Sequence, residues 1–227
     1  MLKAIIFDFD GVITDSEPVH LKMFQKVLKE MGISLNEKEY YEKYLGMDDK
    51  GCFATVLQSH GLNNPSNQIQ SLIEKKTGYL MEYIKKDLFI FPGVKDFIKT
   101  VQNKYRLAIA SGALRHEIEF VLRYAGIHSA FELIVSAEDV KYGKPDPECF
   151  NKTLERLNGE GTQEIKAEEC LVIEDSIAGI EAAHSAGMKC IAVTNTYGQD
   201  RLTMADMVVK SLVEIKIEEL EVLINRF

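Results

Sequence analysis

The sequence lacks an excess of basic residues, a long apolar run and paired cysteines. Its 27 lysines and arginines are outnumbered by 35 aspartates and glutamates, giving a net charge of −8. Nucleic-acid-binding domains carry a basic face, so this balance argues against a nucleic-acid partner. No apolar run approaches the roughly 20 residues that span a bilayer, and Asp8 and Asp10 interrupt the first apolar stretch before it can form a secretory signal. We therefore expect a cytoplasmic protein that does not bind or span a membrane.

The cysteines also exclude a common kind of site. Cys52, Cys149, Cys170 and Cys190 are scattered, without a C-x-x-C pair or a zinc-like spacing. Cys170 and Cys190 lie in apolar runs, so we expect reduced thiols inside a core. Hydrophobic residues make up 46% of the 227 residues, enough for a sizeable core without cross-links.

Short apolar runs alternate with helical patterns over most of the chain. The runs predict strands at 3–9, 105–110, 131–136, 170–174, 189–194 and, more weakly, 207–209. Between and after them, helical spacing predicts helices at about 94–103, 114–125, 147–157, 177–186 and 214–226. Strands that alternate with helices predict an α/β fold with a doubly wound, Rossmann-like parallel sheet.

Residues 15–88 differ from the rest because they contain no strand pattern. Their apolar residues recur at helical spacing, and turn signals separate the helical stretches. We interpret 15–88 as a helical domain inserted after the first strand, and 1–14 with 89–227 as the α/β core domain. Lys75 and Lys76 could reach a cleft, but we expect them on the solvated face of one of the inserted helices.

Polar groups follow several of the predicted strands. They are Asp8, Asp10 and Gly11 after the first strand, Ser111 and Gly112 after the second, Lys144 after the third, and Glu174 and Asp175 at the end of the fourth. Taken singly, each has an ordinary structural interpretation as a turn, a helix cap or a surface lysine. Ligands of open parallel sheets bind at the carboxyl ends of the strands. Four such groups in succession therefore predict a functional site.

The residue types at these strand ends suit phosphoryl transfer. One carboxylate of Asp8 and Asp10 can attack phosphorus while the other serves as general acid and base. Asp8 and Asp175 can share a Mg²⁺ ion, which prefers hard oxygen ligands. Lys144 adds a cation, and the Ser111 hydroxyl with the amides that begin the next helix can bind phosphate oxygens.

Four segments carry a resemblance to a known family. FDFDGVITDSE, ASG, KYGKPDPECF and VIEDSIAGIEAAHSAGM resemble the signature motifs of the haloacid dehalogenase superfamily. The inserted helices resemble the C1-type cap of the subgroup that contains β-phosphoglucomutase and phosphoglycolate phosphatase. In that subgroup the cap closes over the substrate, and the reaction uses Mg²⁺.

The resemblance implies roles for the strand-end residues. Asp8 would be the nucleophile that forms an aspartyl-phosphate, and Asp10 would protonate the leaving group and then activate water. Ser111 and Lys144 would hold the phosphoryl group, next to Gly11 and Gly112. Mg²⁺ would bind the Asp8 carboxylate, the Asp10 backbone carbonyl and Asp175, with Glu174 as a ligand through water or an outer residue.

The inserted segment bears on the choice between a hydrolase and a mutase. His20 and Gly46 match substrate-binding positions of β-phosphoglucomutase-like proteins. In the mutase, a lysine just before the glycine and an arginine shortly after it grip a second phosphate, but here those positions hold Leu45 and Asp49. We therefore expect a monomeric phosphatase acting on a small phosphorylated metabolite, such as a sugar or polyol phosphate. A phosphomutase is the alternative, followed by a non-catalytic phosphate-binding protein.

Overall fold

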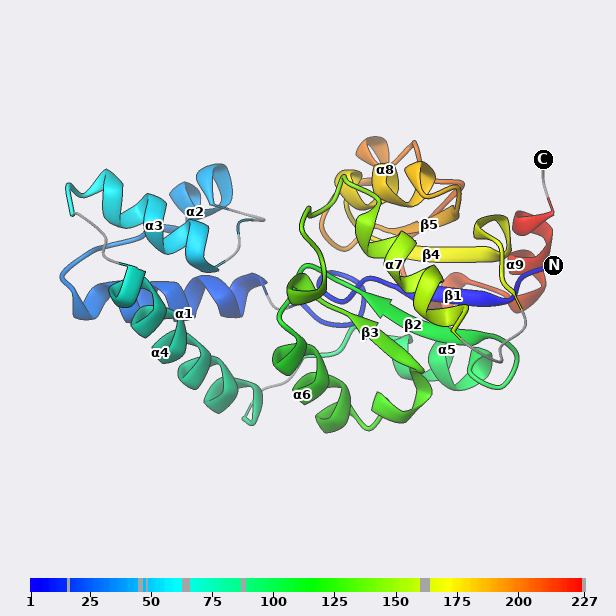
Figure 1. The fold of residues 1–227 in the computed structure, drawn as a ribbon, viewed down its shortest axis with the longest axis horizontal. Coiled ribbons are helices and arrows are strands. Elements are labelled where there is room, and N and C mark those ends of the chain that lie inside the picture. Colours follow the sequence, from blue (N-terminus) through cyan, green and yellow to red (C-terminus); the bar gives the residue numbers. More distant parts are fainter. Residues whose placement is uncertain are drawn as a thin grey trace. The chain divides into compact units, whose positions relative to one another are not determined.

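The larger part of the chain is built around a parallel β-sheet (Figure 1). Its strands are β1 (Ala4–Phe7), β2 (Arg106–Ala110), β3 (Leu133–Val135), β4 (Cys170–Glu174), β5 (Lys189–Val193) and β6 (Met207–Val209). They pair in the order β3-β2-β1-β4-β5-β6, and every pair is parallel. The order changes direction on either side of β1, as in doubly wound sheets, so the predicted fold class is confirmed.

The computed structural model describes residues 1–15, 17–44, 47, 49–62, 66–86, 89–159 and 164–225. By its internal contacts the chain divides into two units, one of Met1–Asp15 with Phe89–Phe227 and one of Ser16–Leu88. We call the first the core unit and the second the helical unit. None of the helices in the described ranges is long and apolar enough to cross a membrane.

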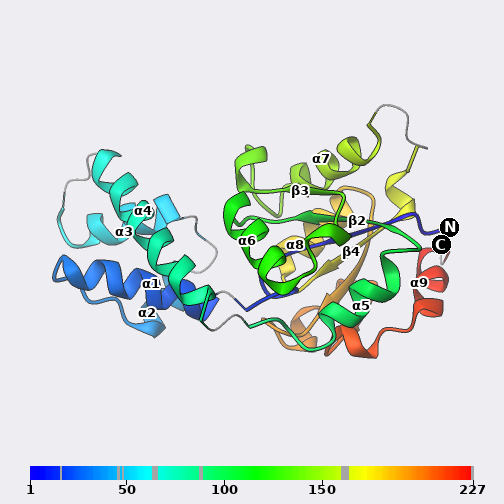
Figure 2. The ribbon, with the colours of Figure 1, turned by 90° about the horizontal axis from the view of Figure 1, so that it is seen from below.

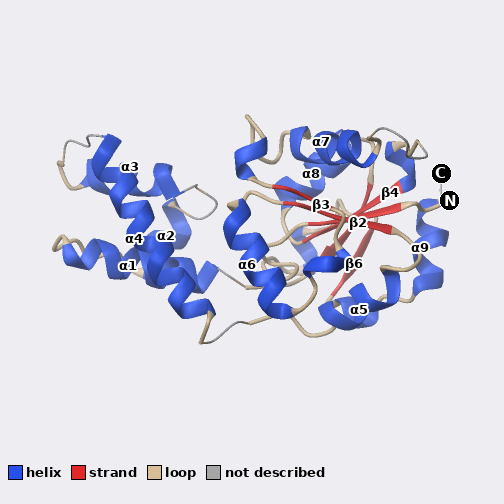
Figure 3. Cartoon of the chain, turned by 60° about the horizontal axis from the view of Figure 1, so that its bottom comes forward, coloured by secondary structure: helices blue, strands red, loops and turns tan. Residues whose placement is uncertain are grey.

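Helices cover both faces of the sheet in the core unit. In Figures 2 and 3, α7 (Glu148–Leu157) and α8 (Ile177–Ser185) lie on one face, and α5 (Val94–Val101) and α9 (Ile217–Ile224) lie on the other. The helix α6 (Arg115–Ala125) follows β2. All four residues of β1 are fully buried, as a central strand between two helical layers requires.

The two faces of β1 pack against different helices. Ala4 and Ile6 belong to an apolar cluster that includes Phe150 of α7 and Ile180 of α8. On the opposite face, the Phe7 ring lies edge-on to Phe97 of α5, with the ring centroids 6.1 Å apart. Because both of its faces are buried, β1 is held in the middle of the sheet, and the residues that follow it lie at the middle of the sheet's carboxyl edge.

The helical unit consists of α1 (Glu17–Glu30), α2 (Glu37–Lys43), α3 (Asp49–Ser59) and α4 (Ser66–Ile84). Its own apolar core includes Phe24 of α1, Tyr40 of α2 and Phe53 of α3, with the Phe24 and Phe53 rings 4.9 Å apart. Because these side chains bury one another within residues 16–88, the unit has a core independent of the sheet.

Candidate active site

A largely buried lysine joins two carboxylates at the carboxyl edge of the sheet. The Lys144 Nζ lies 2.9 Å from an Asp8 carboxylate oxygen and 2.6 Å from Glu174 Oε1. It also donates a hydrogen bond to the carbonyl of Ala110 at the end of β2. The structure therefore brings together a residue that follows β1, a residue that follows β3 and the last residue of β4, as the positions of the strand ends predict.

The Glu174 carboxylate is fully buried and occupied by hydrogen bonds. Its Oε2 accepts from the backbone amides of Asp175 and Ser176 and from the Ser176 hydroxyl, at 2.9, 3.1 and 2.9 Å. Its Oε1 accepts from Lys144. Gly179 of α8 is needed here because a Cβ at that position would lie 1.9 Å from Glu174 Oε1. The side chain is thus fixed in one orientation behind Lys144.

Asp175 lies next to the turn that follows β1. A Cβ on Gly11 would lie 1.9 Å from Asp175 Oδ2, and Gly11 has a φ of +76°. Only glycine allows this turn to approach the carboxylate so closely. Ser176 is the N-cap of α8, because its side chain accepts a hydrogen bond from the Gly179 amide.

Burial dominates the electrostatics of the two aspartates. It raises the pKa of Asp8 to about 6, although the nearby Lys144 ammonium lowers it. Burial, together with the Glu174 and Asp8 charges, raises the pKa of Asp175 to about 8. Burial lowers the pKa of Lys144, but Asp8 and Glu174 outweigh it and raise that pKa well above 10.5. Three carboxyl side chains therefore share an enclosed space with this ammonium, and their burial and mutual repulsion favour protonation of the aspartates.

This donor set fits a hard divalent cation. Asp8, Glu174 and Asp175 each offer a carboxylate oxygen, and these atoms lie within 4.8 Å of one another. Mg²⁺ is bound by one or two carboxylates together with waters and phosphate oxygens. Because the Glu174 oxygens already accept four hydrogen bonds, Asp8 and Asp175 are the better candidates for direct ligands.

The remaining strand-end residues lie in the segments that directly follow β1 and β2. Asp10 is half-buried and forms an isolated bridge with Thr14, which closes the turn around Gly11. Ser111 is buried, and its hydroxyl oxygen accepts a hydrogen bond from the Ala113 amide. Gly112 is exposed beside it. Ser111 directly follows the Ala110 carbonyl that Lys144 contacts, so it lies on the edge that carries Asp8.

Comparison with known proteins identifies the family. The model of the family described as haloacid dehalogenase-like hydrolase matches residues 5–193, which include every strand-end residue named above. The chain belongs to the haloacid dehalogenase-like hydrolases. This agrees with the resemblance seen in the four sequence motifs, and the α/β sheet is the framework on which the hydrolase carries its candidate active site.

Relatives of this haloacid dehalogenase-like hydrolase include named phosphatases. A phosphorylated carbohydrates phosphatase of Thermotoga maritima is 30% identical over 192 residues, which is 84% of each chain. Hexitol phosphatase B of Escherichia coli is 26% identical over 96% of each chain. Among solved structures, β-phosphoglucomutase from Clostridium difficile superposes with a TM-score of 0.84 at 28% identity, covering 99% of this chain and 98% of that one.

The helical unit of the hydrolase holds a buried polar cluster of its own. Lys76 of α4 is fully buried, and its ammonium pairs with Asp49 at the start of α3 and lies 2.7 Å from His20 Nδ1 of α1. Burial and the Lys76 charge lower the pKa of His20 well below 6.5, so the ring is neutral and can accept this hydrogen bond. The ammonium also lies 4.6 Å from the centre of the Phe24 ring.

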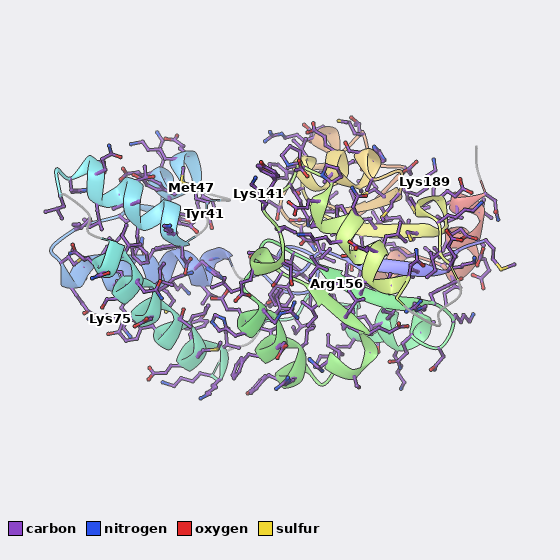
Figure 4. All side chains as sticks on the ribbon, in the orientation of Figure 1. Tyr41, Met47, Lys75, Lys141, Arg156 and Lys189 are labelled. Carbon is purple, nitrogen blue, oxygen red and sulfur yellow. The ribbon has the colours of Figure 1, made fainter. Side chains whose placement is uncertain are left out.

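This cluster corrects one prediction. Lys76 does not lie on the solvated face of its helix. Lys75 is exposed there (Figure 4), and its ammonium pairs with Glu30. The signal was present in the sequence, because Lys76 lies four residues from both Leu72 and Leu80 on the apolar side of α4. The predicted substrate-loop residue Gly46, with Leu45, lies outside the described residues.

Two residues that the sequence analysis did not single out also contact the candidate active site. Asn195, which follows β5, donates a hydrogen bond from Nδ2 to the Gly11 carbonyl at 2.7 Å. The adjacent Thr196 hydrogen-bonds the Asp175 side chain and lowers its pKa. No motif identifies either residue; their position after the fifth strand, at the same sheet edge, was the available signal.

Proposed function

We propose that this hydrolase is a Mg²⁺-dependent phosphatase that cleaves a small phosphomonoester, a sugar or polyol phosphate, through an aspartyl-phosphate on Asp8. The observation that carries the proposal is the group formed by the buried Asp8 and Asp175 with the largely buried Lys144 at the carboxyl edge of the sheet. Binding alone requires no carboxylate nucleophile, and the half-buried Asp10 stands two residues further on to supply the second carboxyl group.

The first half-reaction would transfer the phosphoryl group to the protein. An Asp8 carboxylate oxygen attacks phosphorus and forms the new P–O bond, while the ester P–O bond breaks. Asp10 gives its proton to the departing alkoxide, so the product leaves as an alcohol. Lys144 stays beside Asp8 and offsets the charge of the phosphoryl oxygens.

The second half-reaction would release phosphate. Asp10, now a carboxylate, takes a proton from water as the water oxygen attacks phosphorus. The bond between phosphorus and the Asp8 oxygen then breaks, which restores the Asp8 carboxylate and leaves inorganic phosphate. Bound Mg²⁺ would supply positive charge that screens Asp8 from the anionic substrate. Asp8, Asp175 and the Asp10 carbonyl would hold it, and Glu174 would orient Lys144 from behind.

The names of the relatives support the substrate class. One relative is a phosphatase of phosphorylated carbohydrates and another acts on hexitol phosphates by name. Sequence identity of 26 to 30% supports a shared substrate class rather than a shared substrate. We therefore propose a sugar or polyol monophosphate without choosing among them.

A mutase of the β-phosphoglucomutase type is the second candidate, because that structure is among the similar ones. The helical unit argues against it. A mutase must bind a bisphosphate, which requires a cation for the second phosphate. Here the buried Lys76 ammonium is already paired with Asp49. The acidic side chain neutralises the cation and would repel a second phosphate.

The deciding experiment measures phosphate release from a panel of sugar, polyol and glycolate monophosphates with Mg²⁺. We expect release that EDTA abolishes and that Asp8→Asn lowers by at least about 1000-fold. Asp96→Asn on α5, an exposed carboxylate of the core unit, serves as the matched control and should stay near wild type. No release from any ester by a folded protein would contradict the phosphatase proposal, and interconversion of glucose 1- and 6-phosphates with a bisphosphate primer would then support the mutase.

A further inference from the structure

The turn that follows β1 is fixed by hydrogen bonds on both sides of Gly11. The Gly11 amide donates to the Thr14 carbonyl at 2.8 Å, which sets the plane of the Asp10–Gly11 peptide. The Gly11 carbonyl accepts from Asn195 Nδ2 at 2.7 Å, which sets the plane of the next peptide. The first of these bonds lies within the turn, whereas the second comes from the loop after β5, 184 residues away in sequence.

The bond from Asn195 ties this turn to the loop that follows β5. Gly11 lies against the Asp175 carboxylate, where there is no room even for a Cβ. The same loop after β5 also reaches Asp175, through the hydrogen bond of Thr196. Asn195 therefore contacts Gly11, and the neighbouring Thr196 contacts the Asp175 carboxylate against which Gly11 lies.

We propose that Asn195 is a positioning residue that holds the Asp10–Gly11 turn against Asp175. This inference rests on the proposed function of the site. The Asp10 backbone carbonyl and the Asp10 carboxyl group both belong to this turn, so its orientation sets where the acid and base group and the oxygen ligands lie. The Asn195 side chain is exposed and fills no part of the apolar core, so its hydrogen bond is what it contributes to this region.

The test compares Asn195→Ala and Asn195→Asp with Gln199→Ala. Alanine removes the donor, and aspartate keeps the size but places a carboxylate oxygen against the Gly11 carbonyl. Gln199 is exposed in the short 3₁₀ helix Gln199–Arg201 and controls for changes in the same region. We expect kcat to fall about 10-fold in both Asn195 variants. KM should stay within about twofold of wild type, because the Asp10 carboxyl group that would be displaced acts in the chemical step.

A second readout does not depend on catalysis. Calorimetric titration of Mg²⁺ into the substrate-free protein should give a dissociation constant about 10-fold weaker in both Asn195 variants, since outer contacts of this kind orient the ligands. Circular dichroism melting checks that the variants remain folded. If kcat and the Mg²⁺ dissociation constant both stay within about twofold of wild type, the positioning role is wrong.

These readouts separate the two proposals. A wild-type protein that releases no phosphate from any ester, but whose Mg²⁺ binding weakens with Asn195→Ala, would overturn the phosphatase proposal and support the positioning role. If the wild type releases phosphate but the Asn195 variants keep its kcat and its Mg²⁺ dissociation constant, the phosphatase proposal stands and the positioning role is wrong. A wild type that binds no Mg²⁺ would overturn the positioning role, because there would be no ligand set for Asn195 to orient.

Discussion

Lys144 links two carboxylates of the candidate active site: Asp8, which is proposed to react, and Glu174, which lies behind the lysine. Its ammonium lies between Asp8 and Glu174, and all three side chains are largely shielded from water. In such surroundings an unpaired charge is costly, so the lysine lets Asp8 stay ionised where burial alone would favour its neutral form.

Replacing this lysine should therefore cost activity through the charge state of Asp8. Lys144→Met keeps most of the side-chain volume but removes a cation that lowers the pKa of Asp8, which burial raises to about 6 even with the lysine present. The carboxyl then holds its proton to higher pH, and the phosphoryl oxygens lose a partner. We expect phosphate release at pH 7 to fall about 100-fold or more.

The pH profile separates these effects from a general loss of folding. Because the neutral form of Asp8 is the inactive one, raising the pH should recover part of the lost activity in Lys144→Met. Lys141→Met, in the same loop but exposed, is the matched control and should keep the wild-type profile. A Lys144→Met protein with wild-type activity at pH 7 would contradict the role of the ammonium.

For single residues, the sequence predicts site membership better at the end of a strand than in an irregular loop. Asp8, Lys144 and Glu174 could be placed together because parallel strands end at one edge. Asn195 could not, because its contact depends on the direction of one side chain in an irregular loop.

Among the elements, the strands and helices were predicted closely, and the differences have local causes. The run 131–136 predicts a strand, but β3 ends at Val135 because Ser136 caps the short 3₁₀ helix Ala137–Asp139, exchanging hydrogen bonds with Asp139. The run 3–9 likewise gives a strand that ends at Phe7, since the chain begins the Gly11 turn soon after. Capping and turn formation compete with apolar periodicity at such ends.

The helical unit offers a test of what a buried ion pair contributes to element packing. Lys76 of α4 joins α3 through Asp49 and α1 through His20, and within the described residues Asp49 Oδ2 has no hydrogen-bond partner. Lys76→Met would leave this carboxylate in place without its cation. We expect the free energy of unfolding to fall by about 3 kcal/mol, measured by urea unfolding.

The neighbouring lysine provides the control. Lys75→Met removes an exposed cation from the same turn of α4 and should leave the stability close to wild type, since exposed pairs contribute little. Adding Asp49→Asn to Lys76→Met should restore part of the lost stability by removing the unpaired charge. If Lys76→Met were as stable as Lys75→Met, the cluster would not hold these helices together.

For the whole molecule, the division into two units separates the candidate metal ligands from the buried cluster of the helical unit. Asp8, Glu174 and Asp175 belong to the core unit, whereas His20, Asp49 and Lys76 belong to the helical unit. Each unit has its own apolar core, so we expect each to respond to a perturbation by itself. The sequence indicated the helical nature of residues 15–88 through their periodicity, but their buried polar contacts arise from packing between helices.

This separation predicts how the molecule melts when Mg²⁺ is added. A ligand that binds only the native core unit stabilises that unit by mass action, by about 2.7 kcal/mol when its concentration is 100 times its dissociation constant. In scanning calorimetry, Mg²⁺ should therefore raise the melting temperature of the core unit, and EDTA should reverse the shift. Asp175→Asn should abolish it, because the carboxylate then cannot serve as a ligand. Hydrogen exchange of α1 and α4 amides would report the helical unit separately, and we expect Mg²⁺ to leave it unchanged. Equal protection of both units by Mg²⁺ would mean that they unfold as one cooperative body.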